Sequence, residues 1–161
     1  MLCVYTDGGC NPNPGPGAWA AVVVDGDEVV WEMADFYYCQ TTNNRMEMYA
    51  VIYSLKYLLE NRIERPVKLF CDSQLVVNIY NRWGEAWEKR GWQGFSSKRV
   101  KNLDLVQQML VLKKRLPLVK VEWVKGHNGN RWNEHVDRIV RNMLKSFIDP
   151  ENERKKLRLA R

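Results

Sequence analysis

The sequence has no apolar run long enough to cross a lipid bilayer. Its longest uninterrupted apolar stretch, Ala18–Val24, is far shorter than the roughly 20 residues that a membrane-spanning helix needs. The first residues reach Asp7 without a cationic segment or a long apolar run, so no secretory signal is visible. We therefore expect a cytoplasmic protein with no membrane partner.

Zinc and disulfide signatures are also missing. The four cysteines (Cys3, Cys10, Cys39 and Cys71) contain no CxxC pair and form no zinc-like group with the two histidines. Cys3 and Cys71 lie in apolar runs, where a free thiol behaves as a small hydrophobic group. A reducing compartment is the simplest interpretation, although the sequence does not decide whether any of the thiols pair.

What the chain does contain is ordinary for one folded domain. Its 161 residues allow one sizeable core but not comfortably two. Hydrophobic residues make up 45% and charged residues 27%, which argues against a wholly disordered or fibrous chain. Lys and Arg exceed Asp and Glu by 25 − 19 = 6. This excess favours a polyanionic partner without requiring one.

The order of the predicted elements indicates an α/β domain. Three short apolar segments joined by turns, Leu2–Thr6, Ala18–Val24 and Glu28–Tyr38, predict an antiparallel meander. The four-three-four spacing from Met48 to Leu59 predicts a helix over Asn44–Asn61. The remaining predicted elements are a strand at Val67–Cys71, helices at 73–83 and 102–115, a strand at Leu118–Val124 and a helix at Trp132–Phe147. The pattern βββ-α-β-α-α-β-α predicts a mixed five-stranded sheet flanked by helices within residues 1–149, followed by a charged tail at 150–161.

Two predicted strands are each expected to end in an aspartate, Asp7 after Leu2–Thr6 and Asp72 after Val67–Cys71. If these strands are parallel neighbours about 4.8 Å apart, the two carboxylates lie side by side. Such a pair needs a cation or a shared proton, and a hard divalent metal is one solution. The alternative is that both are turn residues, which Gly8-Gly9 after Asp7 favours.

Other candidate polar residues also have ordinary interpretations. Glu47 has the spacing of a capping box with Asn44. Asp137 is compatible with a solvated position on the last helix. His127, in a Gly-rich polar loop, and His135, on the helix, are both compatible with surface positions.

Four sequence blocks, taken together, resemble the type 1 ribonuclease H family. They are Thr6–Cys10 followed by Asn13-Pro14-Gly15-Pro16-Gly17, Thr41-Thr42-Asn43-Asn44-Arg45-Met46-Glu47, Cys71-Asp72-Ser73-Gln74, and Trp123–His127 with Asn133-Glu134 and Asp137. They occur in the family's order between residue 2 and about residue 147. The resemblance implies a ribonuclease H-like fold.

The resemblance assigns the catalytic chemistry. Asp7, Glu47, Asp72 and Asp137 match the metal-binding carboxylates, and His127 matches a loop histidine that serves proton transfer or product release. The implied cofactor is a pair of Mg²⁺ ions, with Mn²⁺ as a substitute. The implied reaction is endonucleolytic hydrolysis of the RNA strand of an RNA–DNA hybrid, leaving 3′-hydroxyl and 5′-phosphate ends, by a monomeric enzyme.

The same resemblance assigns substrate contacts. Asn13, Thr42 and Asn43 match positions that hold a DNA-strand phosphate, while Asn44 and Gln74 match groups that reach base edges or sugars in the minor groove. Capping of the helix by Thr42 or Asn43 is an alternative, and it is compatible with phosphate binding because helix N-termini attract anions.

A basic, Trp-rich segment over residues 82–101, here called the handle, carries six cations and two anions. It resembles the protrusion with which bacterial enzymes of the family bind the DNA strand. The candidate contacts are Trp83, Trp87, Lys89, Arg90, Trp92, Lys98, Arg99 and Lys101. The four-residue spacing of Trp83 and Trp87 instead favours packing, so at least one tryptophan is expected to be structural.

Two other functions stay open at the level of sequence. One is a nuclease of the same fold that acts on DNA, and the other is a catalytically silent module that binds hybrids. The intact set of four carboxylates argues against the second alternative. The Asn43–Glu47 block and the handle argue against the first.

Overall fold

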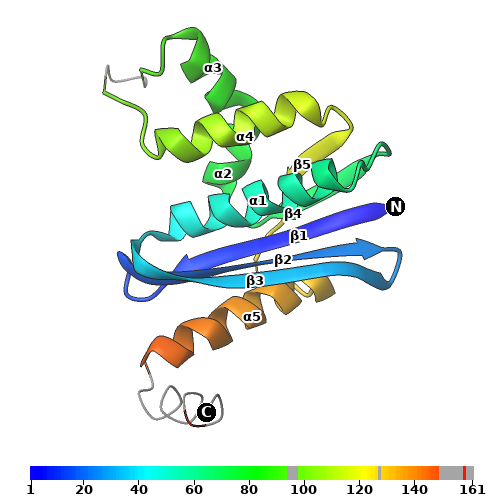
Figure 1. Ribbon diagram of the computed structural model, residues 1–161, viewed down its shortest axis with the longest axis vertical. Helices are drawn as coiled ribbons and strands as arrows, with labels where there is room; N and C mark the ends of the chain where they lie inside the picture. The colour runs from blue at the N-terminus through cyan, green and yellow to red at the C-terminus, as the bar shows by residue number, and fades with distance from the viewer. Residues whose placement is uncertain (94–97, 127, 149–157, 159–161) are drawn as a thin grey trace.

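A five-stranded sheet with the order β3-β2-β1-β4-β5 forms the centre of the computed structural model, which describes residues 1–93, 98–126, 128–148 and 158 (Figure 1). The strands are β1 (Leu2–Cys10), β2 (Gly15–Asp25), β3 (Glu28–Thr41), β4 (Val67–Cys71) and β5 (Val119–Trp123). The first three are antiparallel, whereas β4 and β5 run parallel to β1 and to each other. The predicted meander and the mixed five-stranded sheet are both confirmed.

Helices cover the two faces of this sheet. They are α1 (Asn43–Glu60), α2 (Gln74–Asn78), the π-helical turn η1 (Ile79–Trp83), α3 (Gly84–Lys89), α4 (Leu103–Arg115) and α5 (Arg131–Ile148). The helices α1 and α4 pack together on one face, and α5 packs on β1 and β2 from the other (Figure 1). None of the helices in the described part of the chain is long and apolar enough to span a membrane.

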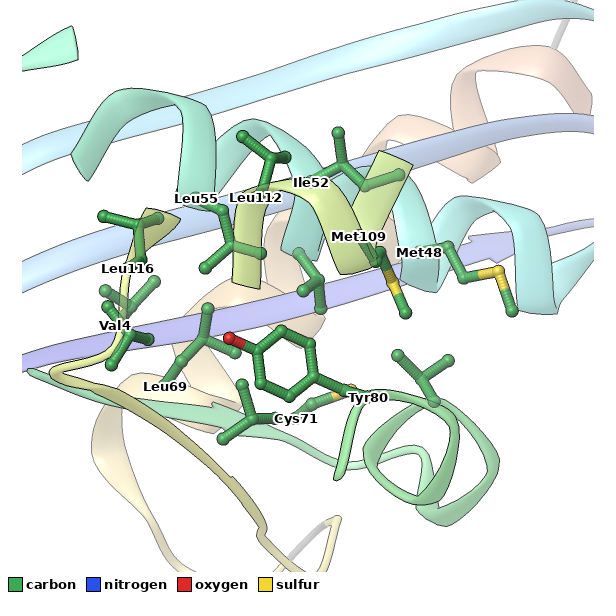
Figure 2. Close-up of a cluster of buried hydrophobic side chains, with 14 of the residues drawn as sticks. Val4, Met48, Ile52, Leu55, Leu69, Cys71, Tyr80, Met109, Leu112 and Leu116 are labelled. Atoms are coloured by element: carbon green, nitrogen blue, oxygen red, sulfur yellow. The ribbon is translucent and has the colours of Figure 1, made fainter. Parts of the chain in front are cut away.

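The main core lies between α1, α4 and the centre of the sheet. Val4 and Leu69 from the sheet meet Ile52 of α1 and Met109 of α4, all with at most 1% of their surface exposed (Figure 2). The ring of Tyr80 enters the same cluster. This packing fixes the start of α1 relative to the ends of β1 and β4, where the candidate site lies.

The expectation that Asp7 ends its strand is wrong, because β1 continues to Cys10 in register with Gly17 of β2. Gly8-Gly9 is therefore not a turn. A Cβ atom on Gly8 would lie 2.3 Å from the carbonyl carbon of Met46, so glycine is needed there for the close approach of β1 to α1.

The helix expected to end at residue 83 extends further. The π-helical turn η1 continues α2 directly into α3, which ends at Lys89. Gly84 does not break this helix, since it has helical dihedral angles and packs closely against Leu110 of α4. Only Arg158 of the predicted tail at 150–161 lies within the described residues.

Candidate active site

Asp7 and Asp72 lie next to each other at the carboxyl end of β4. The parallel register pairs Thr6 of β1 with Cys71 of β4, and each aspartate is the next residue in its chain. The side-by-side arrangement expected from the sequence is therefore present. Asp7 is 6% exposed, and the charge of Asp72 acts on it directly.

Glu47 joins this pair from α1 and does not form a capping box. The N-cap of α1 is Thr42, whose hydroxyl accepts a hydrogen bond of 3.2 Å from the backbone N–H of Arg45. Glu47 lies a turn further along the helix and is 8% exposed. Its carboxyl group is hydrogen-bonded to that of Asp7. The capping-box interpretation of Glu47 is thus wrong.

Asp137 is the fourth carboxylate of the cluster. Its side chain is 19% exposed, so the interpretation of Asp137 as a freely solvated residue is wrong. Its charge acts on Asp7. Its Oδ2 atom also lies 2.9 Å from Nε of Arg141, one turn further along α5.

Burial and mutual repulsion dominate the electrostatics of Asp7 and Glu47 within the cluster. Burial, followed by the charge of Asp72, raises the pKa of Asp7 to about 7, against an ordinary value of 3.8. Burial and the charges of Asp7 and Asp72 raise the pKa of Glu47 well above its ordinary value. A bound divalent cation would relieve this repulsion, and a set of carboxylate oxygens suits a hard ion such as Mg²⁺.

Sequence reasoning did not place Cys71 at the site. Ligand atoms of Cys71, Glu47 and Asp72 lie within 4.8 Å of one another, and the Cys71 thiol donates to Oε2 of Glu47 over 3.8 Å. Burial raises the pKa of this thiol well above 9.0, so it stays neutral and serves as a donor. The sequence feature that could have indicated this placement is the position of Cys71 directly before Asp72, on a strand in which every second side chain is buried.

The loop that carries His127 begins beside the carboxylates. A Cβ atom on Gly126 would lie 3.3 Å from Oδ2 of Asp72. His127 itself lies outside the described residues, so its expected role stays a prediction. His135, also on α5, lies beside β3, where its Nε2 atom is 3.1 Å from Oε1 of Glu32. Its side chain is partly exposed, in agreement with the surface position considered for it.

Asn13, Thr42 and Asn43 converge in front of α1. The amide oxygen of Asn43 accepts from the backbone N–H of Cys10 at 2.8 Å, and that of Asn13 accepts from the backbone N–H of Asn43 at 3.3 Å. Both asparagines are exposed. Because their oxygens are used internally, their NH₂ groups remain as donors at the positive end of a helix, which is an environment suited to an anion.

Asn44 and part of the handle surround one hollow of about 310 Å³. Its lining includes Asn44, Leu75, Trp87, Lys98, Arg99 and Lys101. The structure thus brings the expected minor-groove contact Asn44 together with four of the expected handle contacts. Gln74 is the first residue of α2 and is exposed. It directly precedes Leu75, which lines the hollow.

The tryptophans of the handle have a structural role. Trp83, Trp87 and Trp92 are partly buried and pack against the main core, and the rings of Trp83 and Trp87 are 6.3 Å apart. The expectation that at least one is structural is confirmed. Trp87 also lines the hollow, so packing and substrate contact are compatible for this residue.

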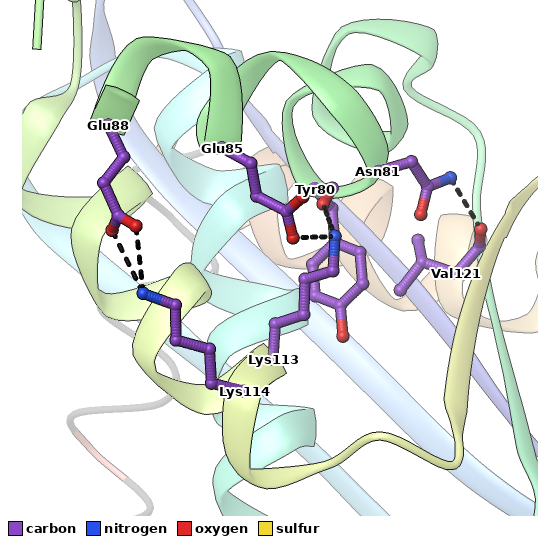
Figure 3. Close-up of polar contacts among 7 residues, drawn as sticks. All are labelled: Tyr80, Asn81, Glu85, Glu88, Lys113, Lys114 and Val121. Atoms are coloured by element: carbon purple, nitrogen blue, oxygen red, sulfur yellow. Dashed lines mark hydrogen bonds and ion pairs between the residues drawn. The ribbon is translucent and has the colours of Figure 1, made fainter. Parts of the chain in front are cut away.

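Ion pairs fix the base of the handle to α4. Lys113 lies 2.9 Å from Glu85, and Lys114 lies 3.0 Å from Glu88 (Figure 3). Lys113 also donates to the backbone oxygen of Tyr80. The five expected cationic contacts Lys89, Arg90, Lys98, Arg99 and Lys101 are all exposed, whereas residues 94–97 between them lie outside the described part of the chain.

Comparisons with known proteins agree with this architecture. A family model described as RNase H matches residues 1–145. A protein named ribonuclease H from Syntrophomonas wolfei is 40% identical over 150 residues, which cover 91% of this chain and 97% of that one.

Two solved structures extend the similarity to the fold. LC9-RNase H1, described as a type 1 RNase H with the type 2 active-site motif, has a TM-score of 0.74 and 27% identity, covering 90% of this chain and 72% of that one. LC11-RNase H1, solved with an RNA/DNA hybrid, has a TM-score of 0.69 and 21% identity, covering 92% of this chain and 100% of that one, and at this identity supports the fold alone. The chain therefore belongs to the ribonuclease H family and is an endoribonuclease.

Proposed function

We propose that the protein hydrolyses the RNA strand of RNA–DNA hybrids by a two-metal mechanism, leaving 3′-hydroxyl and 5′-phosphate ends. The observation that carries the proposal is the cluster of Asp7 in β1, Asp72 directly after β4, Glu47 in α1 and Asp137 in α5. Two of its members are nearly buried and have raised pKa values. Such repulsion favours the binding of divalent cations. LC11-RNase H1, a structural neighbour, has been solved with a hybrid.

The four carboxylates are the proposed metal ligands, with Mg²⁺ as the preferred ion and Mn²⁺ as a substitute. When bound, two such ions supply activation of the attacking water and neutralisation of charge on the leaving 3′-oxygen. Cys71 takes no part as a ligand, because its neutral thiol suits Mg²⁺ poorly. It instead holds Glu47 in place by donating to Oε2.

Binding of the hybrid is assigned to donors and cations around the cluster. The NH₂ groups of Asn13 and Asn43 are proposed to hold one phosphate of the DNA strand at the N-terminus of α1. Asn44 and Gln74 are proposed to read the minor groove, where the 2′-hydroxyl distinguishes RNA from DNA. The handle cations are proposed to bind further phosphates without sequence recognition.

His127 is proposed to transfer a proton or to assist release of the product. The loop that carries it starts within contact distance of Asp72, as the position of Gly126 indicates.

Residues 1–149 are proposed to form the catalytic domain, acting as a monomer in the cytoplasm. Light scattering at working concentration tests the monomer, and a dimer mass would contradict it.

One experiment separates the proposed activity from the two alternatives. The protein is incubated with matched RNA–DNA, RNA–RNA and DNA–DNA duplexes, each with Mg²⁺ or with chelator. Cleavage confined to the RNA strand of the hybrid and abolished by chelator supports the proposal. Cleavage of DNA would indicate a DNA-acting nuclease, and tight binding of the hybrid without cleavage would indicate a silent binding module.

A further inference from the structure

Helix α5 carries a row of cations that the proposed function does not use. Arg131, Arg138 and Lys145 are exposed and follow one another at seven-residue intervals, which is about two helical turns, so they lie along one line of the helix surface. These three residues are called the α5 stripe. Its ends are about 21 Å apart at 1.5 Å per residue.

The stripe is the solvent-facing side of an amphipathic helix. Val136 and Val140 on the opposite side are at most 3% exposed and pack against β2. Among the described residues, no carboxylate lies within ion-pair distance of the stripe. Glu134 lines the same hollow as Arg131 and Arg138, and its Oε1 atom accepts a hydrogen bond from the backbone N–H of Gly129. The three stripe cations therefore form no ion pair with a carboxylate in the described part of the chain.

The amino end of the stripe adjoins a surface hollow. Arg131 and Arg138 line a hollow of about 570 Å³ together with Trp132 and His135. The guanidinium group of Arg131 lies over the ring of Trp132, 4.4 Å from its centroid. This stacking holds the cation at the rim of the hollow and leaves its N–H groups available to an anion.

Helix α5, which carries the stripe, and α3, at the base of the handle, lie on opposite sides of the sheet (Figure 1). Figure 1 places α3, at the base of the handle, and α5 at opposite ends of the molecule, with the sheet and α1 between them. Asp137, on α5 itself, belongs to the cluster. A duplex that passes across the carboxylates and is held by the handle on one side therefore has α5 on its other side.

We propose that the α5 stripe binds the phosphate backbone of the hybrid duplex beyond the cleavage site, on the side away from the handle. This inference rests on the proposed function. Phosphates along one strand occur about every 3.4 Å of helix axis, so a row of 21 Å is long enough to follow about six of them. The stripe thereby extends the footprint of the enzyme and favours long hybrids over short ones.

The test compares hybrids of about 10 and about 30 base pairs, roughly 34 and 100 Å long. Binding to each is measured by fluorescence anisotropy in chelator, so that no cleavage occurs. The stripe variant carries Arg131→Gln, Arg138→Gln and Lys145→Gln. We expect it to bind the long hybrid about tenfold more weakly than the unsubstituted protein does. The salt slope, which is the slope of log affinity against log salt concentration, is expected to be smaller in magnitude by about 3 × 0.9. Binding of the short hybrid is expected to change little.

The matched control carries Arg62→Gln, Arg115→Gln and Lys120→Gln, three exposed cations away from α5, so that both variants lose the same charge. An equal loss in the control, or an unchanged affinity of the stripe variant for the long hybrid, would overturn the inference. Thermal unfolding checks that both variants fold. Cleavage of the short hybrid in Mg²⁺ is measured separately, because its absence would overturn the proposed function while leaving the comparison of binding intact.

Discussion

Gly8 of β1 lies against Met46 of α1 so closely that a Cβ atom on Gly8 would be 2.3 Å from the Met46 carbonyl carbon and 2.5 Å from the backbone nitrogen of Glu47. These backbone contacts set the distance between the strand that carries Asp7 and the helix that carries Glu47. The geometry of the carboxylate cluster thus depends on the absence of a side chain at residue 8.

Replacement of this glycine is expected to damage both stability and the site. Gly8→Ala must push β1 away from α1, which we expect to cost about 3 kcal/mol or more of unfolding free energy. The matched control is Gly9→Ala, where the nearest atoms to a new Cβ lie at 3.5 Å or more. Urea unfolding of both variants measures the difference, and an equal effect at the two positions would refute the close-contact explanation.

The metal-free protein is expected to become less stable as pH rises from 5 to 8. The pKa of Asp7 is about 7 in the folded protein and 3.8 ordinarily, so in this range the folded state binds more protons than the unfolded state, and stability falls as they dissociate. The shift of the Asp7 pKa from 3.8 to about 7 corresponds to at most about 4 kcal/mol of unfolding free energy, summed over the whole pH range in which the group titrates. Urea unfolding in chelator measures it.

The control for this pH effect is Asp7→Asn, which should flatten the dependence. Lys113 lowers the pKa of Glu85, and Arg45 lowers the pKa of Asp104. Both carboxylates therefore titrate below pH 5 and do not contribute to the expected change between pH 5 and pH 8. Added Mg²⁺ should restore stability at pH 8. A metal-free protein that is equally stable at pH 5 and pH 8 would contradict the electrostatic account of the cluster.

Tyr80→Phe is expected to stabilise the protein by about 1 kcal/mol. Tyr80 is 1% exposed, and its hydroxyl has no hydrogen-bond partner among the described residues. Burial and the charge of Glu85 raise its pKa to about 12. Removing a buried polar group without a partner removes its desolvation cost. Tyr57→Phe, on a partly buried residue, serves as a control with little expected change. Thermal unfolding decides, and a destabilised Tyr80→Phe protein would refute the prediction.

Neutralising the handle is expected to weaken hybrid binding without abolishing chemistry. Lys89→Gln, Arg90→Gln, Lys98→Gln and Arg99→Gln together should raise KM and reduce the salt slope by up to about 4 × 0.9, since each phosphate contact contributes about 0.9. The value of kcat at saturating hybrid should change little. An unchanged salt slope would show that the handle does not bind the backbone.

The sequence predicted the sheet because its strands are separated by strong turn signals and its helices have a clear apolar period. It also predicted the meeting of Asp7 and Asp72, since parallel neighbours bring equivalent residues together. The prediction that a strand ends before Gly8-Gly9 and that a helix ends before Gly84 was wrong. Glycine suits both a turn and a close contact between elements, and these glycines are needed because α1 approaches Gly8 and α4 approaches Gly84. The position of Cys71 beside Glu47 likewise depends on how the helix packs on the sheet.

Asp7→Asn tests the central claim, because it removes one negative charge from the carboxylate cluster while preserving the size of the side chain. We predict that the variant binds the hybrid with normal affinity in chelator but cleaves it at least about a thousandfold more slowly in saturating Mg²⁺. Near-normal Mg²⁺-dependent turnover would contradict the assignment of the carboxylate cluster as the catalytic metal site.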